Sequence, residues 1–277
     1  MSLRIATNIS ALNAQRQMGL TRLNLDRSLE RLASGSRINQ AGDDAAGLAI
    51  SENLRAQVLG LKQARRNAND GISLIQVTEG GLNEVSNMLI RLRELSIQAA
   101  SDTIGNTERQ FIDREFQSLK QEIDRIANIT QFNGIPLLNG RAGIFEIQVG
   151  TGNNPILDRI VYNGERSDAS LDALKLGGES VATKQGSQLA LSVIDDGLVR
   201  VNSIRADLGA LQNRLQSTVN NLAINEENLA AANSRIRDTD IAAEVSELTK
   251  NNILMQSGIS VLSQANNTSA AAIKLLG

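Results

Sequence analysis

Two pairs of adjacent carboxylates, Asp43-Asp44 and Asp195-Asp196, are the side chains whose type and spacing could support general acid–base chemistry. Such chemistry needs a carboxyl group with a shifted pKa inside a pocket that admits a substrate, and no pattern in the sequence indicates such a pocket. Asp44 also stands directly before Ala45, at the start of an apolar segment, which is the position of a helix cap. We interpret both pairs as caps and solvated charge, and no catalytic residue is predicted.

The sequence also lacks the residues and motifs on which other common kinds of catalytic and ligand-binding site depend. The 277 residues include neither Cys nor His, which excludes thiol nucleophiles, disulfides, Ser-His-Asp triads and the common zinc sites. Gly150-Thr151-Gly152 lacks the third glycine and the following helix of a dinucleotide-binding loop, and no glycine-rich segment ends in Gly-Lys-Ser or Gly-Lys-Thr. We expect no enzyme activity, no cofactor and no bound metal.

The composition favours long helices. All five aromatic residues lie between Phe111 and Tyr162, so the flanking arms must build a core from Leu, Ile, Val, Met and Ala, as helix–helix seams do. No stretch reaches the roughly 18 apolar residues of a membrane span, and Met1 to Gln15 lacks the apolar segment of a cleaved signal peptide. The net charge of −2 also disfavours nucleic-acid binding. We expect neither membrane insertion nor a nucleic-acid partner.

Apolar residues recur every seven positions in both arms, as in a coiled-coil seam. The C-terminal arm carries Ile194, Val201, Leu208, Leu215, Leu222, Leu229 and Ile236. The N-terminal arm carries Ile75, Leu82 and Leu89, and a third segment carries Ile112, Phe116, Leu119, Ile123 and Ile126. These stripes predict three mutually packed helices.

Weaker stripes occupy the two ends of the chain. They contain Ile5, Ile9 and Leu12 at one end and Leu248, Met255, Ile259 and Leu262 at the other. Helices of such marginal pattern need a partner surface, so we expect both ends to be soft in a monomer. The glycine stop at Ser34-Gly35-Ser36 and the polar run from Arg237 to Asp240 predict hinges at similar distances from each terminus.

The middle of the chain is irregular and holds both prolines, Pro136 and Pro155. Residues 144–149 and 156–162 are rich in β-branched side chains and bracket a glycine- and asparagine-rich turn, which predicts a β-hairpin around residues 143–163. Residues 164–185 show no period and are expected to form an exposed loop.

Several segments resemble the signatures of bacterial flagellins, in the order of that family. They are Leu32 to Asn39 with Asp43 to Ile50, Arg65 to Ser73, Thr78 to Gly80, Arg91 to Leu95, Gln131 to Gly134, Ser234 to Asp240, Glu244 to Ser246 and Gln264 to Asn266. The resemblance covers about residues 1–140 and 187–277.

This resemblance implies a mainly α fold: an elongated antiparallel helical bundle or coiled coil with a small β-hairpin, plus paired terminal helices. Residues 1–43 with 238–277 would form the terminal coiled-coil domain of the filament's inner core. Residues 44–237 would form the middle domain, and no separate outer domain is expected. Gly80-Gly81 in the long N-terminal helix departs from what a straight helix favours.

The function implied is that of a structural subunit that polymerises into the bacterial flagellar filament used for motility. The seven terminal stripe residues named above are the expected assembly residues. The implied partners are other flagellin subunits, an export chaperone, the filament cap and the hook-junction proteins. The implied location is the flagellum, reached by secretion without a cleaved signal peptide.

A second set of interface residues is also implied by the resemblance. In flagellins that activate Toll-like receptor 5, an Arg-x-Arg-Glu-Leu segment contacts the receptor, and this chain matches it with Arg91, Arg93, Glu94 and Leu95. Glu115 falls at the matching acidic position of the next helix. Because Arg91 and Leu95 are four residues apart, they are expected to share one helix face. Part of the segment is equally explained as a packed helix with a solvated charged face.

Three alternatives remain at this level. A hook–filament junction protein would share the terminal helices but would match the Arg91 to Leu95 and Gln131 to Gly134 segments poorly. A cytosolic coiled-coil scaffold would account for the heptads but not for the hinged, paired termini. A flagellin with an enzymatic insert would need a central domain and, for a zinc protease, His ligands.

Overall fold

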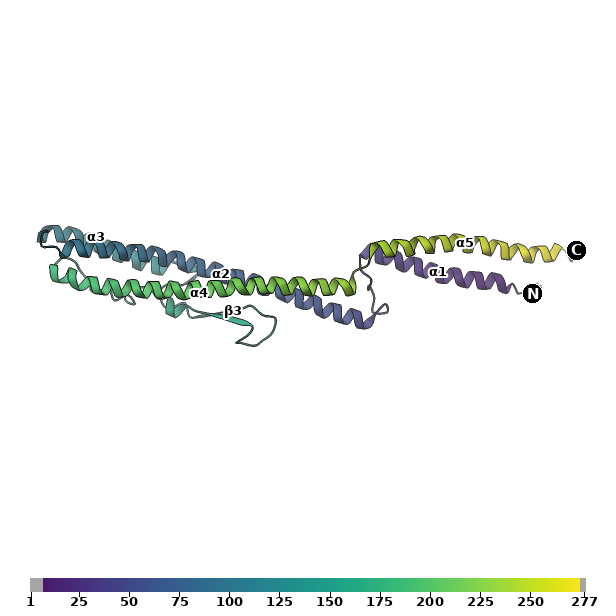
Figure 1. The fold of residues 1–277 in the computed structure, drawn as a ribbon, viewed down its shortest axis with the longest axis horizontal. Coiled ribbons are helices and arrows are strands. Elements are labelled where there is room, and N and C mark those ends of the chain that lie inside the picture. Colours follow the sequence, from purple (N-terminus) through teal and green to yellow (C-terminus); the bar gives the residue numbers. More distant parts are fainter. Residues whose placement is uncertain (1–6, 275–277) are drawn as a thin grey trace. The chain divides into compact units, whose positions relative to one another are not determined.

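The structure, a computed structural model, describes residues 7–274 of the chain and the side chains up to residue 267. Its elements are α1 (Ile9–Ser34), α2 (Ala45–Ala100), α3 (Asn106–Ile129), β1 (Gln131–Phe132), β2 (Ile135–Pro136), β3 (Ile144–Gln148), β4 (Arg159–Asn163), the 3-10 turn η1 (Gly164–Ser167), α4 (Lys184–Arg237) and α5 (Ile241–Lys274). The predicted mainly α fold with a small β-hairpin is confirmed (Figure 1).

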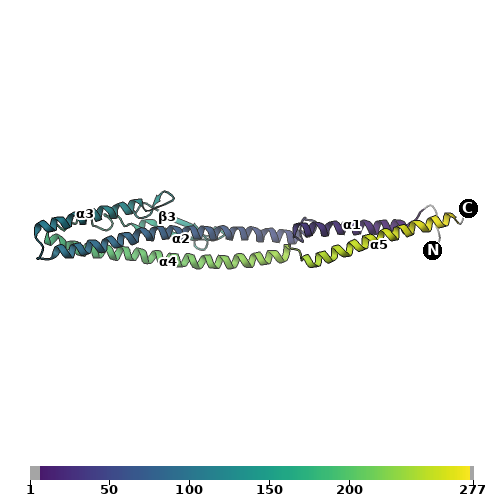
Figure 2. The same cartoon turned by 90° about the horizontal axis from the view of Figure 1, so that it is seen from above.

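Two compact units divide the described chain. The first, here the terminal unit, holds the residues up to Ala56 and from Asn228 onward, and the second, here the bundle unit, holds Gln57–Glu227. In the terminal unit α1 and α5 lie side by side in opposite directions, as Figures 1 and 2 show. Asn8 Nδ2 donates to the Ala265 carbonyl at 2.9 Å, and Arg31 pairs with Glu244 at 3.8 Å.

The two hinges of the terminal unit are bonded to each other through their backbones. Gly35 ends α1 in the left-handed region at φ 70°, where glycine is favoured because it has no Cβ. Ser36 forms an isolated antiparallel bridge with Asp238, and the Arg37 amide donates to the Arg237 carbonyl at 2.6 Å. The predicted glycine stop therefore lies directly against the polar run that precedes α5.

The bundle unit has a core shared by α2, α3 and α4, as the three stripes predicted. The buried cluster includes Ile75, Leu82 and Leu89 from α2, Phe116 and Ile123 from α3, and Ile194, Val201, Leu208 and Leu215 from α4. Every seventh residue of α4 from Ile194 to Leu222 is buried, so the heptad phase read from the sequence is correct over this range.

Four ion pairs connect α2, and the turn directly after it, to α4 along the bundle unit. The residue numbers of the first partners rise as those of their partners on α4 fall. The pairs are Arg65–Glu226 (3.4 Å), Glu79–Arg205 (3.8 Å), Arg93–Asp195 (2.7 Å) and Asp102–Lys184 (2.7 Å). This order fixes an antiparallel pairing of the two helices. We refer to these four pairs as the ion-pair ladder.

Gly80-Gly81 does not interrupt α2. A Cβ added at Gly81 would lie 2.7 Å from both Leu138 Cδ1 and Thr130 Oγ1. The segment that follows α3 therefore approaches the α2 backbone more closely than any larger residue would allow. Glycine at position 81 lowers the helix propensity of α2 but leaves room for this close packing.

The expectation that residues 164–185 form an exposed loop was wrong. Ala169, Leu174, Leu176 and Val181 are buried in the bundle core. Lys120 of α3 donates to the carbonyls of Gly177 and Glu179 at 3.0 and 2.8 Å, and the burial that this requires lowers the pKa of its ammonium. The segment was misread because irregular backbone buries apolar residues without a helical or strand period.

The β3–β4 hairpin is present, but its second strand begins later than predicted. β3 pairs antiparallel with β4 from Ile144 opposite Asn163 to Gln148 opposite Arg159. Ile156 and Leu157, expected in the strand, lie in the turn instead, because the Asp158 amide donates to the Asn154 carbonyl at 2.9 Å and closes the turn there. β-branched residue type alone did not locate the strand start.

Candidate assembly surfaces

The fully buried positions of the seam between α1 and α5 are occupied by small or polar side chains. The buried positions are Ala11, Thr21 and Ser28 on α1 and Asn251 and Ala265 on α5. A Cβ added at Gly258 would lie 2.8 Å from Met18 Cγ, so the two helices approach closely there. Because no large apolar side chain of α1 or of the described part of α5 is fully buried, hydrophobic burial stabilises this seam less than it stabilises the bundle core.

Asn251 adds a cost at the centre of this seam. Its side chain is 2% exposed, and its Nδ2 has no hydrogen-bond partner within the described residues. A buried donor without a partner loses its hydration without compensation. The α1–α5 pair is therefore weakly stabilised by its own contacts, in line with the prediction that the ends need a partner surface.

Large apolar side chains of the same two helices face outward. Their exposed fractions lie between 45 and 59%. They are Ile9, Leu12, Leu20, Leu23 and Leu29 on α1 and Ile241, Val245, Ile253, Leu254, Ile259 and Val261 on α5. We call these eleven residues the outer apolar faces. The gathering of so many exposed large apolar side chains on two helices makes this surface a candidate interaction site.

The predicted assembly residues are distributed over two environments. Ile9, Leu12 and Ile259 belong to the outer apolar faces. Leu248, Met255 and Leu262 are half-buried on the seam side, in register with Asn251 and Ala265, and Ile5 lies outside the described residues.

Sequence reasoning missed Leu20, Leu23, Ile253 and Leu254. The adjacent pair Ile253-Leu254 carried a usable signal, since one helix face cannot bury both side chains.

Arg91 lies at the centre of an exposed charge cluster on the bundle unit. Its guanidinium donates to Glu94 of α2 at 2.9 Å and to Glu115 of α3 at 2.9 and 3.0 Å. The hydrogen bonds to Glu94 and then to Glu115 raise the pKa of Arg91. Glu115, which the resemblance places at the acidic position of the next helix, thus contacts Arg91, and the three side chains form one exposed charged cluster.

Arg93 and Leu95 lie elsewhere. Arg93 donates to Asp195 of α4 at 2.7 Å, as part of the ion-pair ladder. Leu95 is 2% exposed and belongs to the bundle core, so the expectation of an accessible face shared with Arg91 was wrong for Leu95. A spacing of four residues brings two side chains near one another but does not decide which of them faces the core.

The paired carboxylates serve as caps and ion-pair partners, as interpreted. Asp44 Oδ1 accepts from the Gly47 amide at 2.8 Å. Asp43 accepts from the amides of Gln40 and Asn39, and these bonds lower the pKa of Asp43. Asp195 pairs with Arg93. Within residues 7–274 there is no cluster of three side chains suited to hold a metal ion, and none of the helices there is long and apolar enough to cross a bilayer.

Comparison with known proteins shows which family the chain is similar to. The family model for the bacterial flagellin N-terminal helical region matches residues 5–142, and that for the C-terminal helical region matches residues 191–276. The flagellin of Halalkalibacterium halodurans is 44% identical over 269 residues, which cover 97% of this chain and 98% of that protein.

Two further relatives agree. The flagellar filament 33 kDa core protein of Treponema phagedenis is 42% identical over 285 residues, covering 97% of this chain and 98% of that protein. The crystal structure of Bacillus cereus flagellin matches with a TM-score of 0.51 and 30% identity, covering 57% of this chain and 88% of that one.

Proposed function

Because the chain belongs to the bacterial flagellin family, we propose that the outer apolar faces of α1 and α5 are the surfaces through which its copies assemble. The protein is a structural subunit that polymerises into the bacterial flagellar filament used for motility. The observation that carries the proposal is the pattern of the terminal unit: the fully buried positions of its own seam are small or polar, while eleven large apolar side chains are exposed. Neighbouring subunits would supply the missing cover.

The domain division is part of the same proposal. Residues 1–43 with 238–277 form the inner core of the filament, and residues 44–237 form the middle domain, with no separate outer domain. The hinge contacts between Ser36 and Asp238 and between Arg37 and Arg237 support boundaries at these positions.

A charge placed in the outer apolar face tests the assembly surface. In the Ile259→Asp variant, burying the carboxylate between subunits is unfavourable, so the critical concentration for seeded filament growth rises at least about tenfold. The matched control is Gln256→Asp, which adds the same charge at an exposed polar position one turn away. Electron microscopy and sedimentation measure growth, and equal critical concentrations for the two variants would contradict the proposal.

Further partners and the export route follow from family membership. The protein is part of the flagellum, an exported filament. We propose that a chaperone covers the outer apolar faces before export, that export needs no cleaved signal peptide, and that filament-cap and hook-junction proteins contact the same faces at the ends of the filament. We propose no catalytic role. No finding favours the hook–filament junction alternative.

The Arg91 cluster is proposed as an additional surface, a subunit contact in the filament and a contact for Toll-like receptor 5 in the monomer. The support is that Arg91, Glu94 and Glu115 are all exposed and are joined by hydrogen bonds from the Arg91 guanidinium. Arg93, which pairs with Asp195 of α4, and Leu95, which is buried in the core, are not part of this surface.

Arg91→Ala is expected to weaken binding of the purified monomer to the receptor ectodomain by about tenfold or more, because it removes a guanidinium at the centre of the contact. Arg55→Ala is the control, since Arg55 is likewise exposed and pairs with a Glu three residues away. Surface plasmon resonance compares the variants, and intact filaments are expected not to bind. Undetectable binding by the wild-type monomer, or equal affinities for both variants, would contradict the proposed receptor contact.

A further inference from the structure

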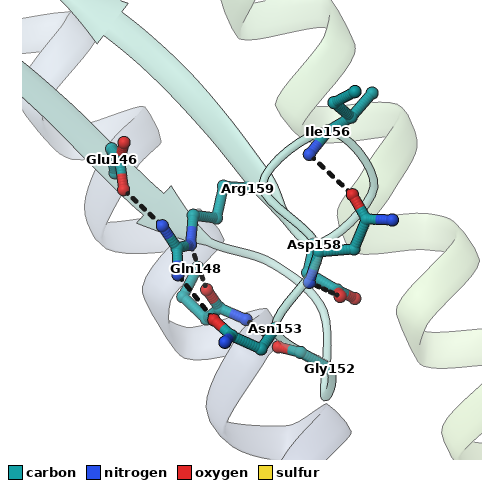
Figure 3. Close-up of polar contacts among 8 residues, drawn as sticks. Glu146, Gln148, Gly152, Asn153, Ile156, Asp158 and Arg159 are labelled. Carbon is teal, nitrogen blue, oxygen red and sulfur yellow. Dashed lines mark hydrogen bonds and ion pairs between the residues drawn. The ribbon is translucent and has the colours of Figure 1, made fainter.

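The turn of the β3–β4 hairpin presents two large aliphatic side chains to solvent. Ile156 is 81% exposed and Leu157 is 77% exposed, the highest values among the large apolar residues of the described chain. Figure 3 shows the Ile156 side chain pointing away from the other labelled side chains of the turn. Two adjacent apolar residues so far from the bundle core contribute nothing to the stability of the subunit itself.

This turn is held by hydrogen bonds rather than left loose. Asn154 Oδ1 accepts from the Ile156 amide at 2.9 Å, and the Asn154 amide donates to Asp158 Oδ2 at 2.9 Å. Arg159 donates to Glu146 at 2.9 Å and to Asn153 at 2.8 Å, as seen in Figure 3. A prearranged apolar tip loses little conformational entropy when it docks, which is the property of a contact surface.

A matching cavity of about 260 Å³ lies on the same bundle unit, between the far end of β4 and α4. Val161, Ile204, Leu208 and Leu211 give its lining an apolar side, and Asn163, Arg166, Ser167 and Asp207 give it a polar side. A cavity of roughly 150 Å³ already holds a benzene ring. The space is therefore sufficient for an aliphatic side chain of the size of Leu157.

We propose that the Ile156-Leu157 tip of one subunit docks into the cavity beside Leu208 and Leu211 of a second copy of this chain. The inference rests on the proposed assembly of the chain and adds to the terminal helices a contact made by the bundle unit. The tip does not fill the cavity of its own chain, because Leu157 is 77% exposed and neither tip residue is among those that line the cavity.

A second copy is the occupant that this geometry favours. The tip and the cavity are different surfaces of one chain, so the contact between copies is head-to-tail. Head-to-tail contacts that do not close generate helical polymers, and the protein is a subunit of such a polymer. Every internal subunit would both insert its own tip and receive another.

The absence of cysteine from the chain makes a direct crosslinking test possible. Leu157→Cys and Asp207→Cys subunits are mixed, grown from wild-type seeds and oxidised. Crosslinked dimers are expected in the filament and not in the unpolymerised mixture, because a disulfide needs Cβ atoms about 4 Å apart. The control mixture replaces Asp207→Cys by Asn213→Cys, an exposed residue of α4 about 9 Å along the helix. Filaments whose dimer yield equals that of the control would overturn the docking.

A second variant covers the case in which the cysteine subunits do not polymerise. The doubly charged Ile156→Asp/Leu157→Asp chain is expected to raise the critical concentration at least about tenfold, because its tip can no longer enter an apolar wall, while Asn213→Asp leaves that concentration unchanged. An unchanged critical concentration for the double variant would refute the docking. Failure of the wild-type chain to form filaments would instead refute the proposed function, so the two failures are distinguishable.

Discussion

Removal of residues 1–40 and 240–277 abolishes filament growth and leaves a folded bundle. The deleted segments carry all of α1 and α5 and all eleven residues of the outer apolar faces. The core shared by α2, α3 and α4 lies between Ala68 and Leu215 and is untouched. Circular dichroism is expected to show a helical, cooperatively melting protein, and electron microscopy to show no filaments even with seeds. Long filaments from the truncated chain would refute the assembly assignment.

Hydrogen exchange on the full chain provides the matched comparison. The α1–α5 seam fully buries few apolar side chains, and the side-chain Nδ2 of Asn251 has no hydrogen-bond partner there. The backbone amides of α1 and α5 are therefore expected to exchange fast in the monomer and slowly in the filament. Equally slow exchange in both states would show that the terminal helices are stable without neighbours.

The largest loss of folding stability is expected from truncating the central heptad positions of α4. Leu208 and Leu215 are both buried in the bundle core. Replacing either by Ala leaves a cavity and is expected to cost about 2 to 5 kcal/mol of the free energy of unfolding. Asn213→Ala is the control on the same helix, since Asn213 is exposed. Urea unfolding of the three variants measures the difference, and equal midpoints for Leu215→Ala and Asn213→Ala would contradict the helix phase.

Periodic features were predictable from the sequence, and features without a period were not. The α4 stripe from Ile194 to Leu222 and the caps at Gly35 and Asp240 depend on local spacing, which the sequence displays directly. The burial of Val181 depends on contacts with α3 about 68 residues earlier in the chain, such as the bond from its amide to Asp113. No local pattern encodes such a contact.

The assembly residues were predicted only in part for a related reason. Hydrophobic spacing indicates that Ile259 and Met255 both lie on an apolar helix, but it does not indicate which of them faces α1 and which faces a neighbour. The outward position of Ile259 became visible only when the seam proved to be filled by Ala265 and Asn251. Leu95 shows the opposite error: it was expected on an accessible face but lies in the core. Its burial depends on where α3 and α4 pack against α2.

The ion-pair ladder settles an ambiguity that the apolar stripe leaves open. A stripe that repeats every seven residues looks the same after α4 slides along α2 by one repeat, so apolar contacts alone permit several alignments. After such a slide Arg93 would face Asn202 or Gln188 instead of Asp195, and Glu79 would face Gln212 or Leu198 instead of Arg205. Exposed ion pairs add little to stability. Their effect here is to make one alignment of α2 and α4 distinguishable from its neighbours, so that the bundle unit folds in a single register.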